Sequence, residues 1–387
     1  MSIIRLTLIK DRLYAPTGLG ALVDTKYAQS NGSRRGLLEV GVNPPHPDSP
    51  PVSALTPSAE LCDYLQFKAS NEAANYVPGA PVTVMVHGFL YDPRDAVTGD
   101  PKQTDNPHGR NFHFKQHDEL EEIRHHTTSW PRQLGFRRND KGKDGVAIAF
   151  GWYSQPGFAT SLLSHHQNYY ARAYDLGRQA SWPLLRVLQS LTDLEKLHSQ
   201  PIDIFCHSLG SVLVIGALTI AAENKLPLLS RIGRVILLGG SEYTDDARKM
   251  YTSVMRYVRR QQWPQDEGPQ FYNIVSRENA VLDVFAENFG PRGLFSSNSQ
   301  VIGHNGLEAR KPTERWIDLQ IDGVGLMEWL AEHDLHISGD NPEEWWDHWY
   351  YYTYRGNMDL YRYILRERPT WTIAECRRGN CPEGVQV

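Results

Sequence analysis

The amino-acid sequence predicts an α/β protein built on a mostly parallel sheet with helices on both faces. Three observations lead to this prediction. Short apolar runs rich in β-branched residues recur along the chain, and longer segments of helical character separate them. The runs are apolar throughout, as expected for strands that are buried on both faces. Strands that alternate with helices in this way indicate parallel strands joined by crossovers.

The length and composition are those of an ordinary globular chain. The 387 residues are enough for a large core, as one domain with insertions or as two domains. Hydrophobic residues make up 40% and charged residues 22%, which excludes a disordered chain. The formal net charge of -5 gives no electrostatic reason to bind nucleic acid or an anionic membrane surface, so we expect neither partner.

The sequence predicts a cytoplasmic protein without stable membrane insertion. Arg5 and Lys10 interrupt the N-terminus before the apolar segment of a signal peptide can form. The longest apolar run, 212–220, is too short to span a bilayer. Four cysteines are too few for a disulfide framework in this chain, so free thiols are expected, although Cys376 and Cys381 are close enough in sequence to pair.

The chain divides into three parts of unequal length. Residues 1–80 begin with a predicted strand, Ile3–Ile9, and carry five prolines between residues 43 and 51. We expect this part to supply strands and a connection that complete one edge of the sheet. Residues 81–366 contain the core elements, and residues 367–387 form a C-terminal tail.

A polar insertion separates two of the predicted core strands. One strand ends at His87-Gly88 and the other covers 145–152. The segment 91–144 between them is rich in Gly, Pro, Asp, Asn and His, with a predicted helix at 118–126. We expect this insertion to form a cap that shapes substrate choice.

The remaining segments continue the alternation of helices and strands. Pro183 is expected to kink or divide the first of the predicted helices. These helices are 165–191, 245–262 and 358–366. The corresponding strands are 234–238, 271–276 and 315–321. The last strand alternates enough in polarity to be an edge strand.

The stretch 201–224 is the most informative part of the sequence. Ile202–Phe205 is a short apolar run suited to a buried strand, and Leu209–Ala222 is apolar almost all round, as a covered helix is. Ser208 lies between them, at a tight strand-to-helix turn that strains the backbone and exposes the hydroxyl. A serine that only caps the following helix is the alternative interpretation.

Several motifs around Ser208 occur in a defined order. A His87–Phe89 turn follows a buried strand, Ser208 follows a second strand, and an acid and a histidine follow later strands. Gly210 fits the G-x-S-x-G pattern, in which Cys206 replaces the first glycine. In this order the chain resembles the α/β-hydrolase superfamily, in its serine esterase and lipase branch. The resemblance covers roughly residues 80 to 366 and implies the α/β-hydrolase fold.

The resemblance also implies a catalytic triad. Ser208 would be the nucleophile, and a histidine in the loop before the last helix would be the general base. His348 is the favoured candidate from that loop, and His304 is its main rival. The alternative interpretation of His348 is an imidazole packed among the aromatic residues that surround it in the sequence.

The orienting acid is expected after the 271–276 strand. Glu278 is favoured by a narrow margin and Asp283 is the other candidate, while Asn279 occupies one alignment of the acid position. The oxyanion would be bound by backbone N–H groups from two turns. The expected donors are those of Leu209 and of Phe89 or Leu90.

No metal or cofactor is expected. His113 and His117 have i, i+4 spacing, but no H-E-x-x-H pattern is present and no cysteine lies nearby. Gly239-Gly240 lacks the G-x-G-x-x-G spacing of a dinucleotide site.

The sequence therefore predicts a serine hydrolase that cleaves small-molecule carboxylic esters through an acyl-enzyme intermediate. Two classes of alternative remain open. One is thioester, lactone or peptide hydrolysis on the same fold, because fold alone does not determine the reaction. The other is a non-catalytic binding protein that retains the scaffold. The physiological substrate and the oligomeric state are not predicted.

Overall fold

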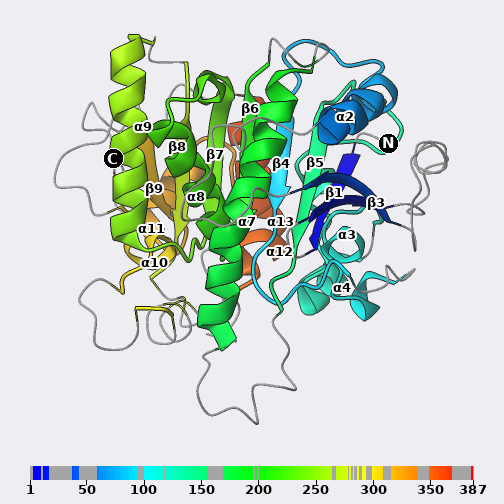
Figure 1. Ribbon diagram of the computed structural model, residues 1–387. Helices are drawn as coiled ribbons and strands as arrows, with labels where there is room; N and C mark the ends of the chain where they lie inside the picture. The colour runs from blue at the N-terminus through cyan, green and yellow to red at the C-terminus, as the bar shows by residue number, and fades with distance from the viewer. Residues whose placement is uncertain are drawn as a thin grey trace.

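The structure, a computed structural model, shows one ten-stranded sheet flanked by helices (Figure 1). It describes residues 3–9, 12–16, 37–42, 59–94, 100–116, 118–155, 169–194, 197, 200–263, 267–277, 279, 282, 286, 290–292, 299–307, 315–337, 348–367 and 385–386. Glu278, Asp283, Cys376 and Cys381 lie outside these residues, as does His117. The strand order is β10-β9-β8-β7-β6-β4-β5-β1-β2-β3.

Seven neighbouring strands are parallel, which confirms the predicted α/β class. In spatial order they are β1 (Ile3–Ile9), β5 (Val146–Trp152), β4 (Val82–Val86), β6 (Ile202–His207), β7 (Ile232–Leu238), β8 (Gln270–Val275) and β9 (Trp316–Gln320). Antiparallel strands flank them on both sides: β2 (Arg12–Pro16), β3 (Leu37–Val42) and β10 (Val385–Gln386). The predicted edge strand β9 is therefore covered by β10, over two residue pairs.

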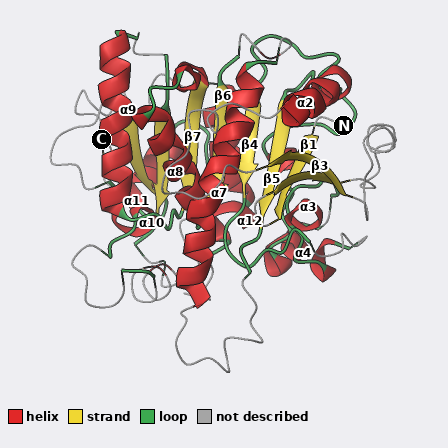
Figure 2. Ribbon diagram, viewed as in Figure 1, coloured by secondary structure: helices red, strands yellow, loops and turns green. Residues whose placement is uncertain are grey.

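Helices cover both faces of the sheet (Figures 1 and 2). One face carries α2 (Ala59–Glu72), α7 (Tyr169–Thr192), α8 (Gly210–Glu223) and α9 (Thr244–Gln261). The other carries α5 (Trp130–Gln133), α11 (Val324–Ala331), α12 (Tyr350–Thr353) and α13 (Arg355–Arg366). Shorter elements are η2 (Pro101–Gln103), α3 (Pro107–Arg110), α4 (Glu119–His125), η4 (Pro227–Arg231) and α10 (Ile302–Asn305). None of the described helices combines the length and the apolar character needed to cross a membrane.

The sheet separates two apolar clusters. Side chains alternate between the faces of a strand, so Ile204 and Cys206 of β6 enter the cluster beneath α7, α8 and α9, while Phe205 enters the cluster beneath α12 and α13. Burial on both faces explains why the strands read as continuous apolar runs. Each fully buried Leu, Ile, Val or Phe contributes roughly 1.5 to 3 kcal/mol to this core.

The structure adds detail to two predicted segments. Pro183 lies inside α7, which continues through it as one helix of 24 residues, so the predicted helix is not divided. The described part of the 91–144 insertion is anchored in the core, because Phe112, Trp130 and Phe136 belong to the cluster beneath α12 and α13. Trp130 packs edge-on against Phe205, with ring centroids 5.2 Å apart. The polar composition of the segment gave no sign of these buried aromatic residues. The role of the segment as a cap stays a prediction.

Candidate active site

Ser208 lies at the turn between β6 and α8, near the middle of the sheet. Its φ of 53° is in the left-handed region, which costs about 1 kcal/mol for a residue other than glycine. No side-chain hydrogen bond caps α8, so the alternative in which Ser208 serves as a helix cap is not what the structure shows. The Ser208 hydroxyl is instead 3.2 Å from the Ser241 hydroxyl, and only 3% of the residue is exposed.

Hydrogen bonds fix the backbone of this turn at both ends. The Ser208 N–H donates to the Leu238 carbonyl over 2.9 Å. The Ser208 carbonyl accepts from the Ser211 N–H at 2.9 Å, from the Ser211 hydroxyl at 2.8 Å and from the Ser241 N–H at 3.2 Å. These contacts connect the turn to the end of β7 and to the first turn of α8.

The loop after β4 packs directly against Ser208. A Cβ atom at Gly88 would lie 2.8 Å from Ser208 Cβ and 2.9 Å from the His207 carbonyl oxygen, closer than real Cβ atoms approach. A Cβ at Gly210 would lie 2.8 Å from the His87 carbonyl oxygen and 3.4 Å from Cys206 Cβ. Because Gly210 has no side chain, α8 passes close to β4 and the Cys206 side chain is accommodated in the core.

Three backbone N–H groups were predicted to bind an oxyanion. Within the described part of the chain, neither the Leu209 nor the Phe89 N–H has a hydrogen-bond acceptor. The Leu90 N–H instead donates to the Ser154 carbonyl over 3.4 Å, and Leu90 has a φ of 70°. Of the three predicted donors, Leu209 and Phe89 are thus the two whose N–H groups have no acceptor among the described residues.

His348 lies beside the end of β6, in a group that we call the histidine cluster: His207, His348, Asn279 and Tyr351. The His207 Nε2–H donates to the backbone carbonyl of His348 over 3.0 Å, and the two rings are 4.7 Å apart. Asn279 Nδ2 is 2.8 Å from His348 Nδ1 and 3.3 Å from the Tyr351 hydroxyl. The cluster thus brings the residue before Ser208 into contact with the predicted base.

The imidazoles of this cluster are buried and neutral. Burial lowers the pKa of His348 well below its usual range, with a further contribution from the nearby His207. Burial also lowers the pKa of His207 to about 4, although the bond to the His348 carbonyl opposes the shift. His348 is 6% exposed, and within the described residues its Nε2 atom has no hydrogen-bond partner. Nε2 is thus the ring atom left free for another group.

The other predicted triad residues are placed as follows. His304 lies on α10, where its Nε2 bonds to the Arg277 carbonyl at 3.1 Å. Glu278 and Asp283 fall outside the described residues, so neither acid is placed. Asn279, which occupies one alignment of the acid position in the sequence, is the residue that contacts His348 Nδ1. No hydrogen bond joins Ser208 to His348 within the described residues.

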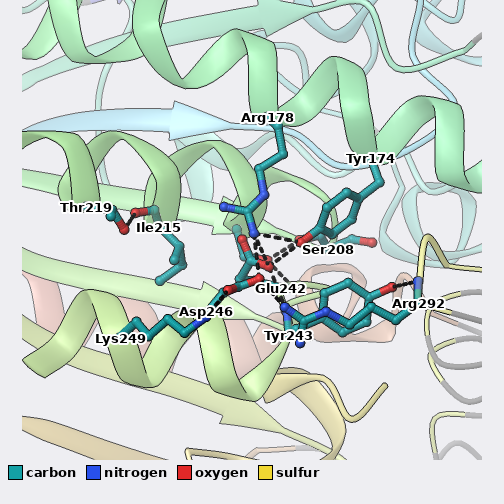
Figure 3. A network of polar contacts seen from close by, with 11 residues as sticks. Tyr174, Arg178, Ser208, Ile215, Thr219, Glu242, Tyr243, Asp246, Lys249 and Arg292 are labelled. Atoms are coloured by element: carbon teal, nitrogen blue, oxygen red, sulfur yellow. Dashed lines mark hydrogen bonds and ion pairs between the residues drawn. The ribbon is translucent and has the colours of Figure 1, made fainter. Parts of the chain in front are cut away.

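A second polar group, the carboxylate cluster, lies between α7 and the first turn of α9 (Figure 3). It consists of Tyr174, Arg178, Glu242, Asp246 and Arg292. Arg178 Nη2 contacts the Glu242 carboxylate at 3.2 Å and the Asp246 carboxylate at 2.7 Å. The Tyr174 hydroxyl donates to the same Glu242 oxygen that Arg178 contacts.

Ser211 joins the carboxylate cluster to the Ser208 turn. The Ser211 hydroxyl accepts from the Glu242 N–H at 3.1 Å and donates to the Ser208 carbonyl. Glu242 is fully buried, and burial raises the pKa of its carboxyl to about 7 against the opposing effect of Arg178. Sequence reasoning missed this cluster, because its members come from α7, the β7–α9 connection, α9 and the segment 290–292, and nothing in the sequence shows that these elements meet. The only signal was the polar pair Ser241-Glu242, which follows a buried strand after Gly239-Gly240.

Comparisons of the chain with protein-family models, with curated proteins and with solved structures find no match.

The described residues contain no group of three or more His, Cys, Asp or Glu side chains placed to bind a metal ion. His113 Nε2, for example, bonds to the backbone carbonyls of Arg110 and Thr127.

Proposed function

We propose that this protein is a serine hydrolase of the α/β-hydrolase type that acts on carboxylic esters. The observation that carries the proposal is the left-handed backbone of Ser208 at the end of a central parallel strand, with a hydroxyl that caps no helix. A strained serine at this point of an α/β sheet is the arrangement that serine hydrolases use. The seven parallel strands are compatible with that fold.

The surrounding groups supply the other parts of the proposed reaction. Ser208 Oγ attacks the ester carbonyl carbon, its proton passes to His348 and then to the leaving alkoxide, and an acyl-enzyme remains. Water adds to the acyl group with His348 as base, which releases the acid and restores Ser208. The N–H groups of Leu209 and Phe89 stabilise the oxyanion, each by roughly 3 kcal/mol in a dry site.

A fluorophosphonate probe tests this proposal. We expect the wild type to form an Oγ–P bond at Ser208 with loss of fluoride, and Ser208→Ala to remain unlabelled. Ser241→Ala is the matched control, because Ser241 is the hydrogen-bond partner of Ser208 but does not occupy the turn. It should still be labelled, with the label mapped to Ser208 by mass spectrometry. Labelling of Ser208→Ala at the wild-type rate would contradict the proposal.

A non-catalytic binding protein is the second candidate. It is favoured by one observation, the amide of Asn279 at the ring nitrogen where a hydrolase triad has a carboxylate. Failure of the folded wild type to label after prolonged exposure, together with failure of every Asn279 variant, would support this second candidate.

A further inference from the structure

All hydrogen-bonding groups of the Asn279 amide are engaged. The Leu282 N–H donates to Asn279 Oδ1 over 3.2 Å and to the Asn279 backbone carbonyl over 3.1 Å, while Nδ2 faces His348 Nδ1 at 2.8 Å and the Tyr351 hydroxyl at 3.3 Å. Rotating the amide by half a turn would turn its NH2 group toward the Leu282 N–H, so the side-chain bond would be lost, two donors would face each other, and only the backbone carbonyl would still accept from Leu282. The Leu282 N–H therefore determines which side of the amide faces His348.

This orientation determines the tautomer of His348. A nitrogen that accepts a hydrogen bond from Asn279 Nδ2 cannot carry a proton. Since neutral imidazole has one N–H, that proton is on Nε2. Nε2 is the buried atom without a partner among the described residues. His348 therefore presents an N–H donor to its surroundings and no lone pair.

A general base for Ser208 needs the opposite tautomer. The base accepts a proton at Nε2, which requires the ring proton to be on Nδ1 and to face an acceptor. We propose, on the basis of the hydrolase function above, that Asn279 is a positioning residue that holds His348 in its non-basic tautomer. Turnover then requires the Asn279 amide to rotate and to give up its bond from Leu282, so the Ser208 hydrolase is held in a slow state.

The pocket around residue 279 already suits a carboxylate. In an Asn279→Asp protein, one oxygen would accept from the Leu282 N–H, and the other from His348 Nδ1–H and the Tyr351 hydroxyl. All three neighbours can donate, so the substitution needs no other change. Replacement of the triad carboxylate by an amide lowers kcat about 10⁴-fold through the wrong tautomer. We expect the reverse substitution to raise turnover here by at least about 100-fold.

Two variants test whether the Asn279 amide slows the reaction or supports the base. The rates to compare are fluorophosphonate labelling of Ser208 and hydrolysis of a short-chain nitrophenyl ester. Asn279→Asp should raise both rates, and Asn279→Ala should also raise them, by a smaller factor, because the ring is then free to carry its proton on Nδ1. An Asn279→Ala protein slower than the wild type would overturn the proposal, since that result is expected of an amide that supports the base. No gain in folded Asn279→Asp would overturn it as well.

The tautomer can be measured without any activity. In protein labelled with ¹⁵N-histidine, the ring signals of His348 are assigned by their loss in His348→Gln. Nε2 should be the protonated nitrogen in the wild type and Nδ1 in Asn279→Asp. A wild-type His348 protonated on Nδ1 would overturn the inference. Correct tautomers in both proteins, with no labelling of Ser208 in Asn279→Asp, would instead overturn the hydrolase function and leave the tautomer assignment standing.

Discussion

Two buried polar groups flank the Ser208 turn and deal with burial in opposite ways. The histidine cluster has no formal charge, because burial keeps its imidazoles neutral. The hydrogen bonds of His207 and His348 are each made by a neutral ring. The carboxylate cluster has charged side chains and pairs Glu242 and Asp246 with Arg178 and Arg292. The stability of the histidine cluster therefore depends on its rings remaining neutral, and that of the carboxylate cluster depends on the arginines that balance its negative charges.

This difference makes the clusters respond to different changes. Removal of one hydrogen-bond partner from an uncharged group costs the desolvation of that group, whereas removal of one ion leaves a buried charge uncompensated. A change of pH also acts on the clusters with opposite sign. Both consequences can be measured as free energies of unfolding, in the following order of expected size.

The largest effect is expected for Arg178→Met, which leaves Glu242 buried without its cation. We expect a loss of roughly 3 kcal/mol at pH 8, the lower end of the range for a broken buried pair, because the Arg178 side chain is 37% exposed. At pH 6 the loss should shrink, since Glu242 can then take up a proton. Urea unfolding at the two pH values provides the measurement.

Lys249→Met is the matched control for Arg178→Met. Lys249 also pairs with Asp246, at 3.6 Å, but its side chain is 76% exposed. Exposed pairs contribute about 0 to 1 kcal/mol, so this variant should be close to wild type. Equal losses in the two variants would show that the carboxylate cluster does not depend on its buried pair.

The pH dependence separates the two clusters by sign. The folded-state pKa of His207 is about 4, against 6.5 when unfolded, so between these values only the unfolded chain binds the proton and stability falls on acidification. The folded-state pKa of Glu242 is about 7, against 4.5, so only the folded chain binds that proton and stability rises on acidification. Each group contributes up to about 1.4 kcal/mol per pH unit.

Single substitutions isolate these contributions between pH 4.5 and 6.5. His207→Gln, whose amide can still donate to the His348 carbonyl, should flatten the loss of stability on acidification. Glu242→Gln should steepen that loss. The measurement is the slope of the unfolding free energy against pH, and slopes that change in the same direction for both variants would show that the clusters do not differ in this way.

The smallest effect is expected at the turn between the clusters. Ser208→Gly should be more stable than Ser208→Ala by about 1 kcal/mol, because only glycine adopts a φ of 53° without strain. Both variants lose the contact with Ser241, so their difference isolates the backbone. Thermal unfolding of the two proteins provides the comparison, and an alanine variant as stable as the glycine variant would mean that the turn stores no strain.

Local patterns were enough to predict the elements around Ser208. The strand before it and the helix after it could be inferred from two apolar runs, a short one and a long one, on either side of a turn. The place of His348 in the loop before the last helix followed from chain order, and the structure places it beside β6 through His207. Whether these residues catalyse a reaction stays a prediction.

Contacts between distant elements could not be predicted. The carboxylate cluster depends on the contact between Tyr174 of α7 and Glu242 of the β7–α9 connection, and no spacing in the sequence shows that contact. The orientation of the Asn279 amide depends on a single backbone N–H, that of Leu282, which residue types cannot indicate. The burial of Phe112 and Trp130 in the core was not predicted, because isolated aromatic residues in a polar segment are usually taken for surface residues.

The Ser208 carbonyl accepts three hydrogen bonds, so we expect this turn to be as rigid as regular secondary structure. The N–H of Ser241 should exchange with solvent deuterium as slowly as those of a core helix, although it lies outside any regular element. A peptide group held this firmly has lost its conformational entropy when the chain folds. The hydroxyl direction of Ser208 is thus set before any ligand arrives, and no ordering of this backbone remains to oppose binding.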